Sequence, residues 1–265
     1  MGQKLFQIDA FTDRPFTGNP AGVCILTEPA DEGWMQQVAM EMNLSETAFL
    51  LPEKDGWRLR WFTPAVEVEM CGHATLASAH LLWERSVLKP DETAVFYTLS
   101  GPLYARRTGR GIELDFPATA PEPADPPEAL LAALGCSCRY SGKSRFDFLL
   151  ELESEEAVRN LRPDFGLLKR IPVRGVMVTS RSDAPGTDFV SRFFAPAVGV
   201  DEDPVTGSAH CCLGPYWAEK TGKNELYAYQ ASRRGGNLTV FVAGDRVRLT
   251  GSAVTVFKAE LLADG

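Results

Sequence analysis

The feature of this sequence that most constrains its fold is an internal repeat. The segment WFTPAVEVEMCGHATLASAHLLWE, residues 61–84, matches FFAPAVGVDEDPVTGSAHCCLGPYWAE, residues 193–219. Both copies contain the pattern Phe-x-Pro-Ala-Val-x-Val followed by an acidic residue, and both contain Gly-x-Ala further along. The second copy has a short insertion between these two patterns. Because a long-range repeat of this kind marks duplicated structural units, we expect two similar halves with a cleft between them.

A proline-rich segment separates the two halves. DFPATAPEPADPPEA, residues 115–129, has a composition that resists both helix and β-ladder, and it predicts a linker. We therefore expect an N-terminal domain over residues 1–118 and a C-terminal domain over residues 122–252. A chain of 265 residues with 45% apolar residues is long enough to bury a sizeable core.

Hydrophobic periodicity predicts the secondary structure. Residues 31–42 are expected to form a helix with Trp34, Val38 and Met42 on one stripe. Residues 73–85 predict an Ala-rich helix with almost no polar face, which indicates burial inside its domain. Further helices are expected at 154–161 and 208–220, and strands at 6–11, 21–26, 47–51, 57–62, 146–151, 173–179, 189–194, 238–242, 246–249 and 254–261.

Charge and composition exclude several classes of function. The net charge of −8 and the short basic runs argue against nucleic-acid binding, which needs a clustered basic surface. The N-terminus lacks the apolar core of a signal peptide, and no apolar run is long enough to cross a membrane. The six cysteines do not resemble the disulfide framework of a small secreted domain, so we expect reduced thiols. These features predict a soluble cytoplasmic protein that does not associate with membranes.

The repeat places a glycine at the start of a helix in each half. These residues are Gly72 in Cys-Gly-His-Ala and Gly207 in Thr-Gly-Ser-Ala. A helix N-terminus offers free N–H groups and a partial positive charge, so each start is a candidate site for a carboxylate or another anion. Either glycine could instead simply begin its helix, but the matched pair favours the binding of an acidic small molecule.

A carboxylate stands at Glu46, where a strand is expected to begin. Period-two geometry places it on the same face as Ala48 and Leu50, so partial burial would raise its pKa and suit it to taking and returning a proton. Its counterpart in the second half falls near Arg174-Gly175, where no acid occurs. The predicted site is therefore asymmetric. The competing interpretation is that Glu46 is an exposed residue at the start of a strand.

Several polar residues near the helix starts fit more than one role. Cys71 and His73 suggest a metal site or a Cys/His nucleophile, but Cys-x-His lacks the paired ligand spacing of zinc motifs, and Cys71 could equally pack as a small hydrophobe. Asp203, in the insertion, could be an ordinary N-cap. Thr206 and Ser208 could cap the second helix or donate hydrogen bonds to a ligand.

Taken together, these motifs resemble the PhzF-like family, the phenazine-biosynthesis type of isomerase, which is similar in fold to diaminopimelate epimerase. The matching segments, in order, are DAFTDRPFTGNPAG (9–22), NLSETAF (43–49), MCGHATLA (70–77), EDPVTGSA (202–209) and VRLTGSAVTVFKAEL (247–261). The resemblance implies an α/β protein of two pseudo-symmetric domains, each a barrel-like mixed sheet around a central helix. It also implies that the terminal strand, residues 253–265, completes the first domain and that the protein is a homodimer.

The resemblance also implies roles for individual residues. It places the proton-transferring acid at Glu46, with His73 and Asp203 orienting polar groups of the substrate, and it implies no cofactor and no metal. The residues it implies for substrate binding are Gly72, Gly207, Ser208, Ser45 and Asn19.

The predicted function is a cofactor-independent isomerase that moves a proton within a small, cyclic or unsaturated carboxylate, with Glu46 as general acid/base. A second possibility is an epimerase or racemase that uses Cys71 and Glu46 as opposed bases. The epimerase relatives have two opposed cysteines, whereas this chain has Thr206 in the second position, which disfavours a two-cysteine racemase. The sequence is also compatible with a non-catalytic small-molecule binder of the same fold and with a Cys71 hydrolase.

Overall fold

The computed structural model describes residues 2–262, and these residues divide into two compact units. Unit 1 takes the described residues up to Asp115 and those from Thr250 onward, and unit 2 spans Phe116–Leu249. The last strand of the chain therefore belongs with the first half, where it pairs antiparallel with the first strand. No helix within residues 2–262 has both the length and the apolar character needed to cross a membrane.

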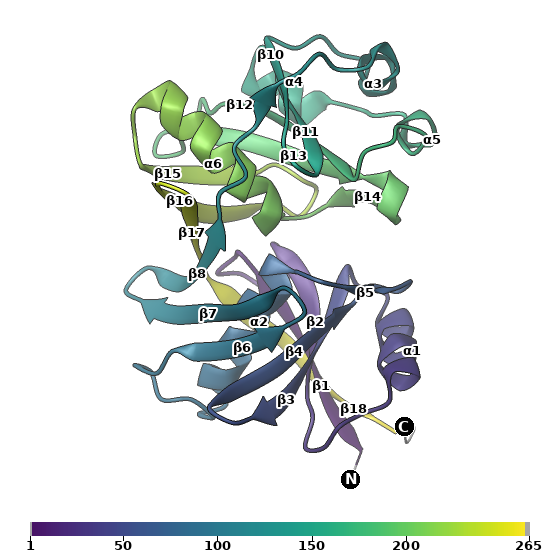
Figure 1. Ribbon diagram of the computed structural model, residues 1–265, viewed down its shortest axis with the longest axis vertical. Helices are drawn as coiled ribbons and strands as arrows, with labels where there is room; N and C mark the ends of the chain where they lie inside the picture. Colours follow the sequence, from purple (N-terminus) through teal and green to yellow (C-terminus); the bar gives the residue numbers. More distant parts are fainter. Residues whose placement is uncertain (1, 263–265) are drawn as a thin grey trace. The chain divides into compact units, whose positions relative to one another are not determined.

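Unit 1 is a mixed sheet with one helix buried against it and one on its outside (Figure 1). Along the sheet the pairings run β18-β1-β2-β3-β4-β6-β7-β8, and β2–β3 and β4–β6 are parallel. The elements are β1 (Gln3–Ala10), β2 (Asn19–Ile25), α1 (Glu32–Met42), β3 (Glu46–Glu53), β4 (Gly56–Phe62), β5 (Glu67–Val68), α2 (Gly72–Glu84), β6 (Ala94–Thr98), β7 (Gly101–Thr108), β8 (Gly111–Pro117) and β18 (Ala253–Leu261).

Unit 2 repeats this order of pairings. The sheet runs β9-β10-β11-β12-β13-β15-β16, and β11–β12 and β13–β15 are its parallel pairs. The elements are β9 (Glu122–Pro123), α3 (Glu128–Leu134), β10 (Tyr140–Lys143), β11 (Asp147–Glu151), α4 (Glu155–Asn160), α5 (Phe165–Leu168), β12 (Gly175–Arg181), β13 (Phe189–Ala195), η1 (Pro196–Val198), β14 (Val200–Asp203), α6 (Gly207–Thr221), β15 (Glu225–Gln230), β16 (Gly236–Ala243) and β17 (Arg246–Gly251). The predicted pair of pseudo-symmetric α/β units is confirmed.

The central helix of each unit is buried, as the sequence predicts. In α2 the side chains from His73 to Ala79 and from Leu81 to Trp83 are all buried, which explains why this helix lacks a polar face. In α6 the buried positions likewise extend around the helix and include Cys211, Leu213 and Trp217. By contrast, α1 lies on the outside of unit 1 and buries only Met35, Val38 and Ala39.

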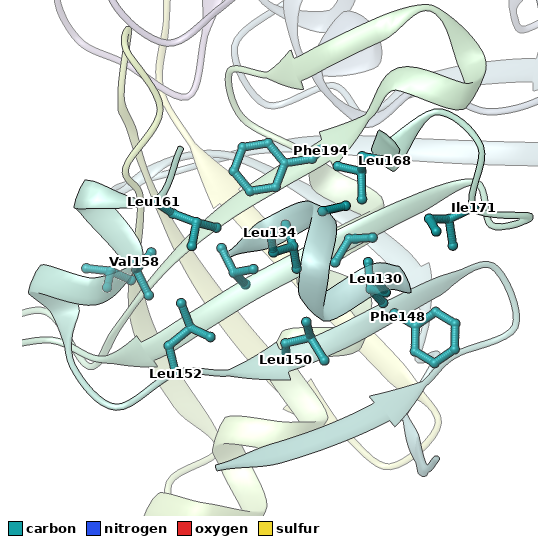
Figure 2. Packing of buried hydrophobic residues seen from close by; sticks show 14 residues of the cluster. Leu130, Leu134, Phe148, Leu150, Leu152, Val158, Leu161, Leu168, Ile171 and Phe194 are labelled. Carbon is teal, nitrogen blue, oxygen red and sulfur yellow. The ribbon is translucent and has the colours of Figure 1, made fainter. Parts of the chain in front are cut away.

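Unit 2 has a second apolar cluster on the opposite side of its sheet. Figure 2 shows Leu130 and Leu134 of α3, Val158 of α4 and Phe194 of β13 packed over the sheet. Unit 1 has an equivalent cluster in which α1 packs on β3 and β4 through residues such as Phe49 and Phe62. Each unit therefore buries its central helix on one face of the sheet and covers the other face with shorter helices.

The prediction that residues 115–129 form neither helix nor β-ladder is wrong in part, since helix α3 already begins at Glu128. Strand β8 continues to Pro117, and Glu122–Pro123 forms the short strand β9, which pairs antiparallel with β10. A two-residue edge strand tolerates proline because only part of its backbone takes part in the ladder. Strand β9 occupies the position in unit 2 that β18 occupies in unit 1, beside the first strand of the unit.

His210 lies in the interior of unit 2 as a packing residue. Its Nδ1 lies 2.8 Å from the Thr206 carbonyl, and its ring stacks on Phe189 with centroids 5.9 Å apart. Burial lowers the pKa of His210 to about 4, although the contact with the Thr206 carbonyl opposes this shift. Since an exposed histidine titrates near pH 6.5, the unfolded chain binds a proton here at a higher pH than the folded protein does.

This difference predicts how stability depends on pH. Between pH 6.5 and pH 4 the proton binds only to the unfolded chain, so His210 should make the free energy of unfolding fall by about 1.4 kcal/mol per pH unit as the pH decreases. His210→Gln should make that slope shallower by about this amount, even if it also lowers stability at every pH. Urea denaturation at several pH values measures both quantities, and equal slopes for the two proteins would contradict the assignment.

Candidate active site

Glu46 and His73 lie together at the start of α2 in unit 1. Glu46 is the first residue of β3, and His73 is the second residue of α2. Glu46 Oε2 lies 3.3 Å from His73 Nε2, and Cys71 Sγ lies 3.5 Å from His73 Nδ1. The structure thus places a carboxylate, an imidazole and a thiol in one cluster, which we call the Glu46 cluster (Glu46, Cys71 and His73).

The imidazole in this cluster is neutral at physiological pH. Burial lowers the pKa of His73 to about 3, so the ring keeps one N–H donor and one lone pair at pH 7. The Glu46 side chain is less enclosed and keeps 18% of its surface exposed, against 5% for His73. His73 Nε2 has no hydrogen-bond partner among the described residues, so the 3.3 Å contact is a close approach of a buried imidazole to a partly exposed carboxylate.

The strand that follows Glu46 is buried on both faces, since Thr47 and Phe49 are as buried as Ala48 and Leu50, so the predicted alternation of burial is not seen here. Ala48 and Leu50, on the same face, are fully buried. In the parallel pairing with β2, Glu46 stands opposite Ala21, and Asn19 lies two residues before Ala21 at the same end of the sheet. Ser45, the residue before β3, is half-buried. The structure therefore brings Ser45 and Asn19 to the sheet end that carries Glu46.

A tight turn leads into Asn19. Gly18 has φ of +67°, and a Cβ there would lie 2.2 Å from the Ala10 carbonyl oxygen. Only glycine fits this position without displacing the backbone. Asn19 itself is fully buried opposite Ala10 in the β1–β2 ladder.

In unit 2, Asp203 is the last residue of β14, and hydrogen bonds hold the loop that leads from it to α6. Its Oδ2 accepts a hydrogen bond from the Thr206 hydroxyl at 2.5 Å, and its carbonyl accepts one from Gln230 Nε2 at 2.7 Å. Gln230 Oε1 also accepts from the Thr206 N–H at 2.8 Å. The fully buried Gln230 thus fixes the backbone on both sides of Pro204 and Val205, and with it the position of Asp203.

Ser208, the second residue of α6, contacts an arginine that the sequence does not single out as a site residue. Arg174 Nη2 donates to Ser208 Oγ at 3.2 Å, and Arg174 Nε donates to Asp147 Oδ1 at 2.8 Å. Asp147 is buried, and the guanidinium also lies over the ring of Phe146, 5.0 Å from its centroid. The ion pair with Asp147 holds Arg174 in the orientation that contacts Ser208.

The helices α2 and α6 begin without a side-chain capping bond, unlike most of the other helices. The N-cap residues of α2 and α6, Cys71 and Thr206, make no side-chain capping bond. In α1, α4 and α5 an Asp or Ser side chain accepts a hydrogen bond from the first turn. No N-cap side chain therefore occupies the first-turn N–H groups that begin at Gly72 and Gly207, which are the candidate site for an anionic ligand.

The interpretation of Asp203 as an N-cap is wrong. The cap position of α6 is Thr206, three residues after Asp203, and the Asp203 carboxylate accepts a hydrogen bond from the Thr206 hydroxyl. The sequence allowed the capping interpretation because any Asp shortly before a helix fits the pattern. Asp203 cannot be the N-cap because it is still part of strand β14, three residues before the cap position.

Sequence reasoning missed Gln230, Arg174 and Asp147. Gln230 reaches the loop before α6 because β15 pairs in parallel with β13, where Ser191 stands opposite Gln230. Asp147 reaches Arg174 because it stands opposite Gly175 in the β11–β12 pair. Both contacts depend on strand pairing between distant segments, and no local motif marks these residues.

The bonds of Gln230 lead to a stability prediction. Gln230→Ala removes the acceptor of the buried Thr206 N–H and the donor to the Asp203 carbonyl, which should lower the free energy of unfolding by about 3 kcal/mol. Gln230→Glu keeps the acceptor, but it buries a charge and places a carboxylate oxygen against the Asp203 carbonyl, so it should be at least as destabilising as Gln230→Ala at neutral pH. Chemical denaturation measures both, and a loss below about 0.5 kcal/mol for Gln230→Ala would show that the loop does not depend on this residue.

Comparison with known proteins places the chain in a family. An uncharacterized isomerase from Halalkalibacterium halodurans is 55% identical over 263 residues, which cover 99% of each chain. The crystal structure of a PhzF-family phenazine biosynthesis protein from Enterococcus faecalis superposes with a TM-score of 0.94 at 41% identity and covers 99% of this chain and 100% of that one. A predicted epimerase from Pseudomonas aeruginosa gives a TM-score of 0.75 at 25% identity, with coverage of 99% and 100%. The family described as phenazine biosynthesis-like protein matches residues 8–259, and this chain belongs to that family.

Proposed function

We propose that this protein is an isomerase that moves a proton within a small, cyclic or unsaturated carboxylate and needs no cofactor. Glu46 acts as the general acid/base. The observation that carries the proposal is the contact between the Glu46 carboxylate and the neutral imidazole of His73 at a helix start that lacks a side-chain cap. The names of the relatives support the same class of reaction, since several are called isomerases.

The proposed reaction uses one group for two proton transfers. Glu46 removes a proton from a carbon of the substrate, and the electron pair of the broken C–H bond passes into the adjoining conjugated system. The protonated Glu46 then delivers the same proton to another carbon of that system, which restores the carboxylate. Because a single group acts on both carbons, the proton should stay on one face of the molecule.

The surroundings of Glu46 suit this reaction. The first-turn N–H groups of α2, which no N-cap side chain occupies, can stabilise negative charge on a substrate carboxylate as the proton leaves. His73 supplies a neutral, buried neighbour 3.3 Å from the Glu46 carboxylate. General acid/base catalysis of this kind contributes about 10² to 10⁴ in rate.

The remaining predicted residues keep their roles in the proposal. Asp203 orients polar groups of the substrate, and Ser208, Ser45 and Asn19 bind it. The uncapped amides that begin at Gly72 and Gly207 supply further donors. The homodimeric state and the cytoplasmic location stay predictions.

The central test replaces the proposed acid. A panel of small unsaturated carboxylates is incubated in D₂O, and double-bond shifts and deuterium uptake are followed by NMR. Glu46→Gln should lower the rate on any converted substrate by about 10² to 10⁴ and leave the fold unchanged, because the amide cannot take up the proton.

The matched control is Glu53→Gln at the other end of β3. Glu53 forms an exposed ion pair with Arg58, so this variant should keep both its activity and its stability. If Glu46→Gln converted the substrate as fast as the unmodified protein, Glu46 would not be the catalytic acid. Substrates that bind by calorimetry but are never converted would instead favour the non-catalytic binder.

An epimerase that uses Cys71 and Glu46 is the second candidate. It is favoured by the Cys71 thiol, 3.5 Å from His73 Nδ1, and by the structural relative named as a predicted epimerase. That reaction would invert a stereocentre and incorporate one solvent deuteron per turnover. Conversion with inversion that is lost in Cys71→Ser would select the epimerase over the isomerase.

A further inference from the structure

The Glu46 cluster combines three types of side chain that bind transition metals. One ligand atom from each of Glu46, Cys71 and His73 lies within 4.8 Å of the other two. A carboxylate oxygen, a thiolate sulfur and an imidazole nitrogen together form a typical ligand set for zinc. The sequence does not predict this set, because Cys-x-His supplies only two ligands and the third comes from a separate strand.

Whichever nitrogen of His73 coordinates, one distance in the cluster already matches a tetrahedral zinc site. Zinc bonds of about 2.0 Å to nitrogen or oxygen and about 2.3 Å to sulfur place neighbouring ligand atoms about 3.3 to 3.6 Å apart. The Glu46–His73 contact is 3.3 Å and the Cys71–His73 contact is 3.5 Å. These two contacts involve opposite nitrogens of the ring, and a zinc ion binds only one of them. The ligand at the other nitrogen must therefore approach the coordinating nitrogen by up to about 1.5 Å, and Glu46 and Cys71 must approach each other by up to about the same distance.

The exposure of the cluster also fits a metal ion. An imidazole nitrogen that carries no proton has a lone pair that can bind a cation. Cys71 and His73 are buried, whereas the partly exposed Glu46 side chain gives access from solvent. Three protein ligands and one open position occupied by water form the usual arrangement of an accessible zinc site.

We propose that Glu46, Cys71 and His73 bind one divalent zinc ion with water as the fourth ligand, and that the bound ion blocks proton transfer by Glu46. The Cys71 thiol loses its proton to solvent as the Zn–S bond forms. The inhibitory part rests on the proposed function, because it requires Glu46 to be the catalytic acid. Metal binding itself depends only on the geometry of unit 1.

The remaining cysteines define the controls. All six cysteines lie in the described part of the chain and are free thiols. Burial raises the pKa of Cys24 and Cys212 to about 12, which opposes the thiolate form that binds metals. The half-buried pair Cys136 and Cys138 is the main competitor for a soft metal, so it must be removed in a control variant.

The test is a titration with Co²⁺, which substitutes for zinc and reports a thiolate ligand by a charge-transfer band in the near ultraviolet. The intact protein should develop this band to one equivalent, and Zn²⁺ should bleach it. Cys71→Ser should abolish the band, and Glu46→Gln should weaken cobalt binding at least tenfold. The double variant Cys136→Ser/Cys138→Ser should keep the band.

The outcomes separate the two proposals. Three results would overturn the metal site: no band in the intact protein, a band that persists in Cys71→Ser, or a band that disappears in the Cys136→Ser/Cys138→Ser variant. Circular dichroism checks that each variant keeps its fold. The cobalt spectrum needs no substrate, so it is unaffected if the isomerase proposal fails. Where a converted substrate is found, micromolar Zn²⁺ should inhibit and EDTA should restore the rate, and full activity of the zinc-saturated protein would overturn the inhibitory part.

Discussion

The arrangement at the start of α2 depends on burying His73 against the carboxylate of Glu46. Burial keeps the imidazole neutral, and the neutral ring can lie 3.3 Å from the carboxylate as a fixed partner. This contact requires α2 to pass through the interior of unit 1, with almost every side chain buried, and to begin where β3 begins. The apolar character of the helix and the chemistry at its first turn are thus consequences of one packing arrangement.

The two units share their architecture, but their chemistry differs. Phe62 and Phe194 are the same position of the internal repeat, and they pair with Thr47 in unit 1 and with Val176 in unit 2. Gly175, the residue before Val176, is therefore equivalent to Glu46, the residue before Thr47. In the same way Ser208 occupies the place of His73 as the second residue of its helix. Where unit 1 presents an acid beside an imidazole, unit 2 presents Arg174 beside Ser208. Duplication therefore supplied two equivalent helix starts, and only one of them carries a group suited to proton transfer.

Much of the fold could be predicted from the sequence because it depends on local patterns. The repeat, the buried helix after Gly72 and the position of Glu46 at the start of a strand follow from periodicity and residue type. The contacts of Gln230 and of Asp147 with Arg174, and the closeness of Cys71 to Glu46, depend instead on how distant strands pair. Strand β9 was missed because prolines dominate its segment, and because its pairing with β10 depends on a strand that lies further along the chain.

The claim on which this account depends is that Glu46 is the group that touches the reacting carbon. The most direct measurement is a crystal structure of the Glu46→Gln variant with a bound substrate, which this variant should hold without converting it. The account predicts that a carbon bearing the mobile proton lies within about 3.5 Å of the side chain at position 46, with the substrate carboxylate at a first-turn amide of a glycine-led helix. A substrate bound with its reacting carbon against a different acid or base, and remote from position 46, would contradict it.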